Sequence, residues 1–504
     1  MLLQDWQDWI FRKKVIKGYF KARLCAVGLL LLLICLGIGI YQSFKVLPEG
    51  LDYQSQPYIV NLSDIDFLQD LTFSDAKGQR QTQQEIFNTV FNYIDSAQQY
   101  ILIDMFLFND FTGSDGQVYK KLSSQLTDKL IAKKRANSDI RINLIVDPIN
   151  TVYGGFDSAQ LRALSEAGIN VVVTDLKPLR DGNPIYSAPW RLFFSYWGNS
   201  LHGYLPQPFS AKAKKVSLRS YLAMLNFKAN HRKTFLFDKD GELVSLVASA
   251  NAHDASSAHS NVALLVRGVF GQELFKSESA VAVMSKNSLE PLPPNLLNPK
   301  AGQNQYAKVS LITEGQIRQT VLGEINKLNE GDHLFLAMFY LSERQVVKAL
   351  LAASKRGVDV RLILDPNKDA FGYEKNGIPN RQVADELIKK SNNKIAVRWY
   401  QTSGEQFHSK LMLAINEQEG ILSLVLGSAN FTRRNIGDYN LETDIWLSTK
   451  RGLNLAQEFE DYFNKLWTNS DGNVYTVDYK TYQDESLINN LFYRFQEFTG
   501  LSSF

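Results

Sequence analysis

Two segments of the chain carry the same set of side chains that could bind a phosphate and react with it. The set is His231, Lys233, Ser249 and Asn251 in the first segment, and His408, Lys410, Ser428 and Asn430 in the second. Each segment has two apolar runs around a polar turn, which is typical of a β-hairpin. Residues two apart on a strand share a face, so each hairpin should present an imidazole, an ammonium, a hydroxyl and an amide together. The ammonium and amide can hold phosphate oxygens while the imidazole attacks phosphorus or transfers a proton.

A single His-x-Lys pair is usually an exposed strand edge without a function. Residue frequencies give about 0.005 chance occurrences of the full pattern in a chain with this many histidines. The pattern occurs twice here, at matching places in two similar halves. We therefore interpret both segments as functional.

The elements that must position these residues also repeat along the chain. In each half, an amphipathic helix is expected to run into an apolar strand, and a second helix and strand then end in Asp-Pro. Asp147-Pro148 corresponds to Asp365-Pro366, and Gly154 corresponds to Gly372. This alternation predicts an α/β fold with a duplicated domain.

A proline-rich segment, residues 288–304, separates the two halves. Proline at that density prevents both helix and central strand, so we expect a linker there. The first repeat is then predicted at residues 55–287 and the second at residues 305–504. The first repeat also has an insertion near residues 184–230 that the second one lacks.

The composition is that of a globular protein, with 504 residues, 45% hydrophobic and 21% charged. A net charge of +3 argues against a protein held to nucleic acid by bulk charge. Cys25 and Cys35 lie in one apolar run, so the sequence predicts neither a disulfide framework nor a cysteine-based zinc site.

That apolar run, residues 24–41, contains no charge and is close to the minimum length for a transmembrane helix. Residues 1–23 before it are rich in lysine and arginine, which predicts a cytoplasmic N-terminus and an extracytoplasmic body. A cleaved signal peptide is the alternative. The run is long for one, and the residues after it offer no cleavage site, so an uncleaved anchor in the cell membrane is favoured.

The insertion carries an unusual mixture of aromatic and basic side chains. They are Trp190, Phe193, Phe194, Tyr196 and Trp197 with Arg191, Lys212, Lys214 and Lys215. Such a mixture suits a membrane surface with anionic lipids. It also suits an aromatic cap packed on the domain, and both alternatives stay open. His202 in the same insertion is expected to be structural.

The two segments resemble the motifs of the phospholipase D superfamily, in which His-x-Lys-x4-Asp is followed by Gly-Ser-x-Asn and occurs twice. The first segment includes the aspartate, Asp238, and the resemblance extends over about residues 66–467. The chain looks most like the bacterial membrane-anchored phospholipase D-like proteins. The resemblance implies two α-β-α domains whose hairpins meet at a pseudo-twofold axis and share one active site. It further implies a phospho-histidine intermediate on one histidine, proton transfer by the other, and neither a metal nor another cofactor.

The chain departs from the family's motifs in the residues around the hairpins. Ile415 stands where the second aspartate is expected, and its neighbour Asn416 could take over the turn; Ala248 replaces a glycine. Such an aspartate supports the hairpin rather than the phosphate, so its loss should cost little.

A further departure concerns the carboxylate that typically orients each imidazole in this family. Glu442 fits that place for His408, whereas Ala263 stands at the corresponding place for His231. Asp254, His253 or His259 could substitute for the missing carboxylate, or could form a polar loop over the site. Family precedent favours His231 as the nucleophile, but a carboxylate partner stabilises an imidazolium, and on that reasoning His408 is preferred.

The leading function is that of a membrane-anchored phosphodiesterase that cleaves or exchanges phospholipid head groups. A cardiolipin synthase-like phosphatidyl transferase and an extracytoplasmic nuclease would use the same chemistry, and the near-neutral charge weighs against nucleic acid. An inactive membrane-surface scaffold is the non-enzymatic alternative. Two complete sets of phosphate-binding residues argue against a scaffold, because it would need neither.

Overall fold

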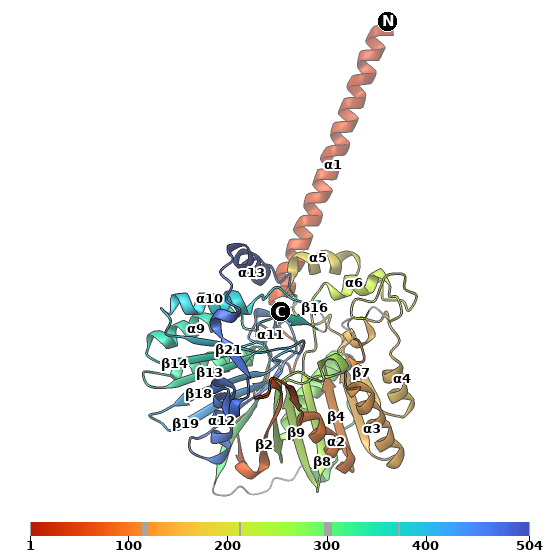
Figure 1. Ribbon diagram of the computed structural model, residues 1–504. Coiled ribbons are helices and arrows are strands. Elements are labelled where there is room, and N and C mark those ends of the chain that lie inside the picture. The colour runs from red at the N-terminus through yellow and green to blue at the C-terminus, as the bar shows by residue number, and fades with distance from the viewer. Residues whose placement is uncertain (1, 113–118, 211–212, 297–304, 371–372, 503–504) are drawn as a thin grey trace.

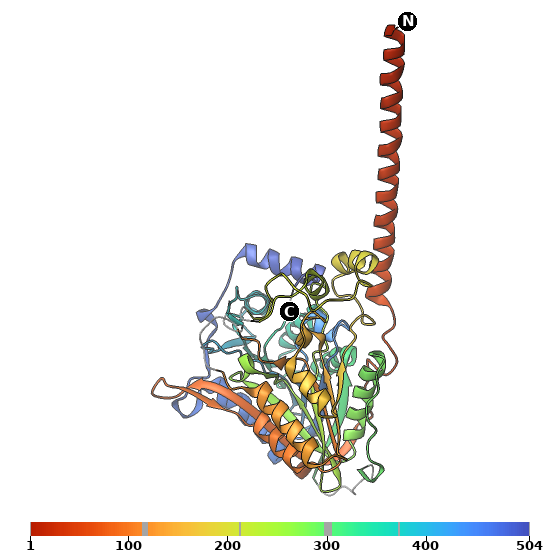
Figure 2. The same ribbon diagram turned by 90° about the vertical axis from the view of Figure 1, so that its right-hand side faces the viewer.

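The computed structural model describes residues 2–112, 119–210, 213–296, 305–370 and 373–502. In this part of the chain, two large mixed sheets lie side by side, each with helices on its outer face, and one long helix projects away from the body (Figures 1 and 2). The α/β duplicated architecture expected from the sequence is thereby confirmed.

The first sheet has the strand order β3-β2-β11-β9-β8-β4-β6-β7 among the described residues. Its strands are β2 (Ile65–Ser74), β3 (Arg80–Gln83), β4 (Tyr100–Met105), β6 (Arg141–Val146), β7 (Asn170–Val173), β8 (Lys233–Lys239), β9 (Glu242–Ala248) and β11 (Asn261–Arg267). Its helices are α2 (Ile86–Ser96), α3 (Leu122–Ala136), α4 (Ala159–Glu166) and α7 (Gly271–Met284).

The second sheet has the order β1-β12-β20-β19-β18-β13-β14-β17-β21 in the described ranges. Its strands are β1 (Tyr58–Asn61), β12 (Tyr306–Thr313), β13 (His333–Met338), β14 (Asp359–Leu364), β17 (Ala396–Tyr400), β18 (Lys410–Asn416), β19 (Ile421–Gly427), β20 (Thr443–Lys450) and β21 (Thr476–Asp478). Its helices are α8 (Glu314–Lys327), α9 (Arg344–Lys355), α10 (Asn380–Lys390), α11 (Arg433–Ile436), α12 (Asn454–Thr468) and α13 (Leu487–Thr499).

Seven strands correspond one to one between the sheets, from β2 and β12 at one side to β7 and β17 at the other. The short pairs β5 (Phe108–Asn109) with β10 (Ala252–His253), and β15 (Asp369–Ala370) with β16 (Tyr373–Glu374), lie outside the large sheets. The central strands β4 and β13 are apolar nearly throughout because both of their faces are covered.

The largest hydrophobic cluster contains residues of both repeats, so the two sheets share a core. Phe67 of β2, for example, meets Phe459 and Tyr462 of α12 in edge-to-face contacts with ring centroids 5.2 and 5.3 Å apart. Aromatic pairs of this geometry add to the free energy of burying the rings themselves. The shared core therefore fixes the two repeats relative to one another.

The N-terminal part of the predicted first repeat belongs to the second sheet. Residues 58–61 form β1, which pairs antiparallel with β12 and covers its edge. An unpaired edge would expose a row of backbone donors and acceptors. In the proline-rich segment, the described residues contain one short turn, Pro294–Leu296, and residues 297–304 lie outside the described ranges.

The projecting element is a single helix, α1 (Leu2–Phe44). In the described residues, Phe11–Phe44 is the one helical stretch long and apolar enough to cross a membrane. The helix is longer than the apolar run because the lysines and arginines before that run are also good helix formers. The insertion contributes two helices, α5 (Pro184–Phe193), which packs beside α1, and α6 (Leu218–Met224).

A buried ion pair connects the repeats next to the first candidate histidine. Arg232 donates to Glu314 of the second repeat (2.7 Å), and its guanidinium also lies 3.4 Å from Glu278 of the first. All three side chains are fully buried, and the two carboxylates raise the pKa of Arg232. Removing the cation would leave two buried carboxylates without compensation.

We therefore predict that Arg232→Met lowers the free energy of unfolding by about 3–5 kcal/mol, since breaking a buried pair strands its partner. Urea-induced unfolding of the full chain in detergent micelles would measure it. Arg80 and Glu405 form a matched control, because they also join the two repeats but the arginine is largely exposed. Arg80→Met should cost less than Arg232→Met, because it leaves one buried carboxylate without its cation instead of two. Equal losses in the two variants would show that the buried pair does not hold the interface.

Candidate active site

Both candidate histidines lie at the interface between the repeats, where two isolated parallel bridges join the chain segments. The bridges connect Asn230 with Leu441 and Phe407 with Ser260. The amide of His231 donates to the carbonyl of Leu441 (2.9 Å), and the amide of His408 donates to the carbonyl of Ser260 (2.8 Å). Each histidine is thus held by the opposite repeat. The charges of the two histidine–lysine pairs also act on each other, as expected of a single site.

Two aspartates fix the residue before each histidine. Asp147 accepts a hydrogen bond from the amide of Asn230 (2.7 Å), and Asp365 accepts one from the amide of Phe407 (2.8 Å). Burial raises the pKa of both carboxyls to about 7. In the sequence, both aspartates follow an apolar strand at matching places in the two halves. That repeated position is the sequence feature that indicates their structural role beside the histidines.

Glu442 contacts His231 and not His408, so the expected pairing is wrong. The distance from His231 Nδ1 to Glu442 Oε2 is 2.9 Å, and Glu442 is fully buried. Its carboxylate also accepts hydrogen bonds from Ser428 and Asn435. The physical reason is the bridge between Asn230 and Leu441, which brings the start of β20 against the opposite repeat.

The partner of His408 is Asn261, which sequence reasoning did not identify. His408 Nδ1 lies 3.2 Å from Asn261 Oδ1. Asn261 corresponds to Glu442, because Ser249 donates to Asn261 as Ser428 donates to Glu442. The residue that corresponds to Glu442 is therefore Asn261, two residues before the expected Ala263. In the sequence, a polar residue stands at the start of the strand after each Ser-x-Asn element. That feature could have identified the partners of the two imidazoles.

The three side chains considered as substitutes for a carboxylate at His231 do not contact it. Asp254 accepts hydrogen bonds from the amide and hydroxyl of Ser123 (3.0 and 2.7 Å). His253 lies between Ser256 and the carbonyl of Phe111. The ring of His259 is 5.9 Å from that of His408, on the other side of the site. The idea that Asp254 supports His231 is thus wrong, since Asp254 anchors the start of α3.

Each lysine lies beside its histidine and against an aromatic ring. The ammonium of Lys233 donates to the carbonyl of His231 (2.5 Å), and that of Lys410 donates to the carbonyl of His408 (2.8 Å). Phe106 and Phe339, at equivalent positions after β4 and β13, were not expected to be functional. Each ring centroid is 5.1 Å from the ammonium and 4.8 or 4.9 Å from the imidazole of its repeat. The rings therefore restrict the histidine and the lysine of each repeat.

The Ser-x-Asn residues have different surroundings from those expected. Ser249 and Ser428 donate to Asn261 and Glu442, so they position the partners of the imidazoles instead of facing a phosphate. Asn251 Oδ1 accepts a hydrogen bond from the amide of Leu107 (3.3 Å). The buried Asn430 Oδ1 has no hydrogen-bond partner among the described residues, and its amide can bind a ligand.

The remaining candidates lie away from the reacting groups. Asp238, at the far end of β8, accepts from the amides of Gln98, Gln99 and Tyr100, which anchors the start of β4. Asn416 accepts from the amide of Glu419 in the turn between β18 and β19. His202 is exposed on the insertion. In the described ranges, no group of three or more His, Cys, Asp or Glu side chains could hold a metal ion.

The electrostatics of the site favour an anionic ligand. Burial lowers the pKa of His231 and of His408 well below the usual value, and the nearby ammonium groups of Lys233 and Lys410 lower both further. Burial also lowers the pKa of Lys233 to about 7 and raises that of Glu442 to about 7. A phosphate among these groups would raise the pKa of each basic side chain, so binding the anion and protonating the site reinforce one another.

Comparisons with known proteins agree with this geometry. Residues 324–467 match the family model described as the PLD-like domain of cardiolipin synthase. No curated protein sequence matches the chain. Among solved structures, phosphatidylserine synthase of Haemophilus influenzae Rd KW20 is similar, with a TM-score of 0.55, 9% identity, and coverage of 89% of this chain and 96% of that chain. At that identity the similarity concerns the fold alone.

Two further solved structures are more distant. Polyphosphate kinase from Porphyromonas gingivalis has a TM-score of 0.43 and 13% identity, over 86% of this chain and 52% of that one. A phospholipase D family member from Salmonella typhimurium has a TM-score of 0.25 and 20% identity, over 34% of this chain and 97% of that one. The matched domain, the duplicated fold and the two His-x-Lys hairpins at one interface together support membership of the phospholipase D superfamily.

Proposed function

We propose that the protein is a membrane-anchored phosphodiesterase that cleaves or exchanges the head groups of phospholipids. The single observation that carries this proposal is the pair of buried His–Lys sets at one interface, each imidazole held at Nδ1 by a partner from the opposite repeat. The names of the matched domain and of the structural neighbour, cardiolipin synthase and phosphatidylserine synthase, point to phosphatidyl groups as substrate. The apolar helix α1 would keep the enzyme beside such a substrate.

In the proposed reaction, Nε2 of His231 attacks phosphorus, and the bond from phosphorus to the head-group oxygen breaks. His408 gives its proton to the leaving alcohol, and Lys233 and Lys410 offset the charge on the phosphate oxygens. Water or an acceptor alcohol then gives a proton to His408 and attacks phosphorus, which releases His231. The product is phosphatidic acid when water attacks and a new phosphodiester when an alcohol does.

The corrected partner of Glu442 reverses the preference for His408 as nucleophile. A carboxylate at Nδ1 stabilises the positive charge that develops on an imidazole bonded to phosphorus. Glu442 provides this for His231, whereas the amide of Asn261 gives His408 a neutral acceptor. A neutral partner is sufficient for a group that only gives and takes a proton.

Replacing either histidine by alanine should reduce kcat by about 10²–10⁴-fold or more, because each has a separate task. A phospholipid with a p-nitrophenol head group separates the two tasks, since this leaving group needs no proton. With it, His408→Asn should release one equivalent of p-nitrophenol and accumulate a phosphorylated His231 peptide, detected by mass spectrometry after acid quenching. His231→Asn should show neither. An adduct on His408 in the His231→Asn variant would reverse the roles.

The pH dependence should depend on Glu442. Because burial raises the pKa of Glu442 to about 7, its carboxyl is protonated below that pH and no longer stabilises a charged His231. We expect kcat/KM to fall as the pH drops through about 7. Glu442→Gln should lower kcat/KM by about 10²–10⁴-fold and remove this acidic limb. Asn261→Leu should lower activity but retain the limb; a limb unchanged in Glu442→Gln would assign it to another group.

The substrate can be tested with the detergent-solubilised full chain and a mixed phospholipid extract, with and without glycerol. Phosphatidic acid should form without glycerol, and phosphatidylglycerol should appear when glycerol is added. EDTA should change neither product if the two lysines provide the positive charge. Lipid left unchanged by the wild type and by His231→Ala alike would contradict the proposal, and cleavage of added plasmid would favour the nuclease.

A further inference from the structure

The C-terminal helix α13 exposes its apolar face. The exposed side chains are Leu487, Ile488, Leu491, Phe492, Phe495 and Phe498, between 46% and 85% exposed. Their spacing places all six on one side of the helix. A continuous stripe of large apolar side chains is rare on the free surface of a soluble protein and marks an interaction surface.

The other face of α13 is polar and lies against the protein, which reverses the usual arrangement of a surface helix. Arg494 pairs with Glu386 (2.8 Å), and the hydroxyl of the buried Tyr493 donates to the carbonyl of Ser342 (3.3 Å). The helix is thus fixed in this orientation by specific contacts. Its apolar stripe points outward because the polar stripe is satisfied inward.

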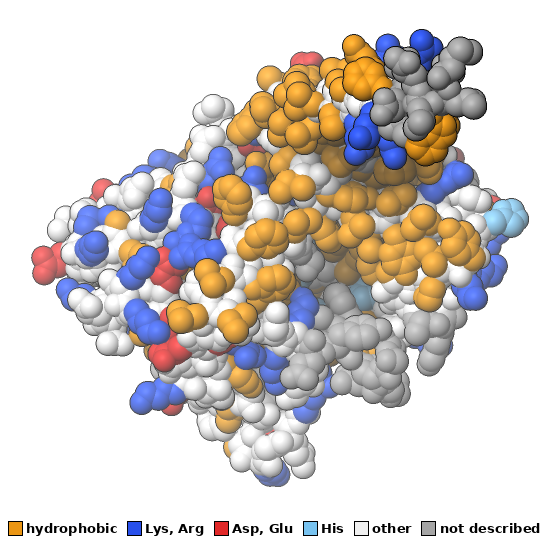
Figure 3. Space-filling model, turned by 90° about the horizontal axis from the view of Figure 1, so that it is seen from above, with side chains coloured by type: hydrophobic (Ala, Val, Ile, Leu, Met, Phe, Trp, Pro, Cys, Tyr) orange, Lys and Arg blue, Asp and Glu red, His pale blue; other side chains and the backbone are white. Residues whose placement is uncertain are grey.

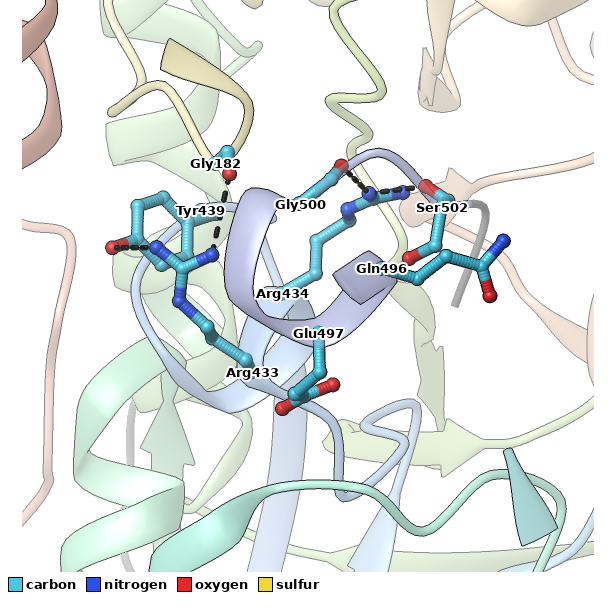
Figure 4. A pocket seen from close by; sticks show the side chains of 8 residues that line it. All are labelled: Gly182, Arg433, Arg434, Tyr439, Gln496, Glu497, Gly500 and Ser502. Atoms are coloured by element: carbon cyan, nitrogen blue, oxygen red, sulfur yellow. Dashed lines mark hydrogen bonds between the residues drawn. The ribbon is translucent and has the colours of Figure 1, made fainter. Parts of the chain in front are cut away.

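The end of α13 joins the insertion, as Figure 4 shows. Arg434 donates to the carbonyls of Gly500 (2.9 Å) and Ser502, and Arg433 donates to the carbonyl of Gly182 (3.4 Å), two residues before α5. The close approach of Gly500 to Gly182 leaves no room for a Cβ atom on Gly500. Helices α13 and α5 are therefore neighbours on one face.

Helix α5 in turn packs on the end of α1. The amide of Asp181 donates to the carbonyl of Gln42 (3.0 Å), and a Cβ on Gly39 would meet Pro184 and Ala188 at 3.5 and 3.7 Å. The helices α1, α5 and α13 thus form a row, which we call the α1–α5–α13 face. Figure 3 shows hydrophobic side chains gathered on this face around α1, and a hollow near its middle in which a histidine is visible.

The insertion adds exposed aromatic and aliphatic side chains to the same face. They are Ile185, Phe193, Tyr196, Trp197, Leu201, Tyr204 and Leu218. Lys214, Lys215 and Arg219 are exposed beside them. Because these rings are exposed, they do not serve mainly as a cap on the domain. Aromatic and basic side chains together suit the boundary between acyl chains and anionic head groups.

The length of the apolar run in α1 determines where a bilayer would lie. Residues 24–41 span about 27 Å as a helix, slightly less than a hydrocarbon core of about 30 Å. All residues of the run are needed to cross the bilayer, so none can serve as a spacer between the bilayer and the body. Gly39, which lies inside the run, already touches α5. A bilayer crossed by α1 must therefore reach the level of α5.

We propose that the α1–α5–α13 face is embedded in the outer part of the same bilayer that α1 crosses, with α13 lying in the plane of the membrane. The proposal rests on α1 spanning a bilayer, not on the chemistry of the active site. If the proposed function also holds, lipids reach the histidines from the membrane without passing through water. A second copy of the chain covering the α13 stripe is the competing occupant.

The position of α13 can be measured on the full chain in nanodiscs that hold one copy each. In a Cys25→Ser, Cys35→Ser background, Phe498→Cys or Leu491→Cys would carry an environment-sensitive fluorophore, and the lipids would carry quenchers on their acyl chains. Both labels should lose fluorescence. Asp240→Cys, in the exposed turn at the far end of β8, is the control and should lose none. Labels at 498 and 491 quenched no more than the label at 240 would overturn the proposal. The proposal would also be overturned if the labels at 498 and 491 became shielded only in discs that hold two copies of the chain.

A kinetic test separates this proposal from the proposed function. Leu491→Glu with Phe498→Glu should raise the KM for phospholipid in vesicles while leaving turnover of a soluble short-chain phospholipid unchanged. Ile59→Glu, an exposed apolar residue on β1, is the matched control and should change neither. An unchanged KM on vesicles would contradict membrane docking. Failure of the wild type to turn over the soluble lipid would contradict the function alone.

Discussion

The pairing of backbone between the two repeats is the constraint on which the site depends. The bridges from Asn230 to Leu441 and from Ser260 to Phe407 bring each histidine beside the strand end of the other repeat. Glu442 reaches His231 only because of this exchange. Neither repeat alone contains an imidazole together with its partner, since each repeat supplies one imidazole and the partner of the other repeat's imidazole. The shared core and the Arg232–Glu314 pair hold the two repeats in the relative position that these bridges require.

Burial determines the electrostatics of this arrangement. Two imidazoles and two ammonium groups are held in a site with one carboxylate in direct contact, so positive charge there is costly until an anion arrives. Phe106 and Phe339 pack against the imidazoles of the two repeats. In such surroundings a fixed charge acts on phosphate more strongly than it would in water. The same burial raises the pKa of Glu442, so the charge beside His231 depends on the pH.

The two repeats have similar backbones, but the residue that contacts the imidazole differs, Glu442 for His231 and Asn261 for His408. This difference gives two equivalent imidazoles different partners, one a carboxyl and one a neutral amide. In the proposed reaction, this difference assigns separate roles to the two histidines without any change in the fold. The exposed apolar elements are also unequal, because among the described residues α13 and the helices of the insertion each occur in one repeat only.

The sequence by itself determined the duplicated α/β fold, the N-terminal apolar helix and the two His-x-Lys hairpins, because these follow from local periodicity and from spacing along one strand. It also marked Asp147 and Asp365, although their contact with the residue before each histidine was not evident. Only the tertiary structure decided that Glu442 serves His231, that Asn261 serves His408 and that β1 joins the second sheet. Those contacts cross between segments far apart in the chain, and spacing within one segment carries no information about which strand end lies opposite. The outward stripe of α13 was likewise decided by packing, since its amphipathic pattern is compatible with either face turned inward until the partners of Tyr493 and Arg494 are known.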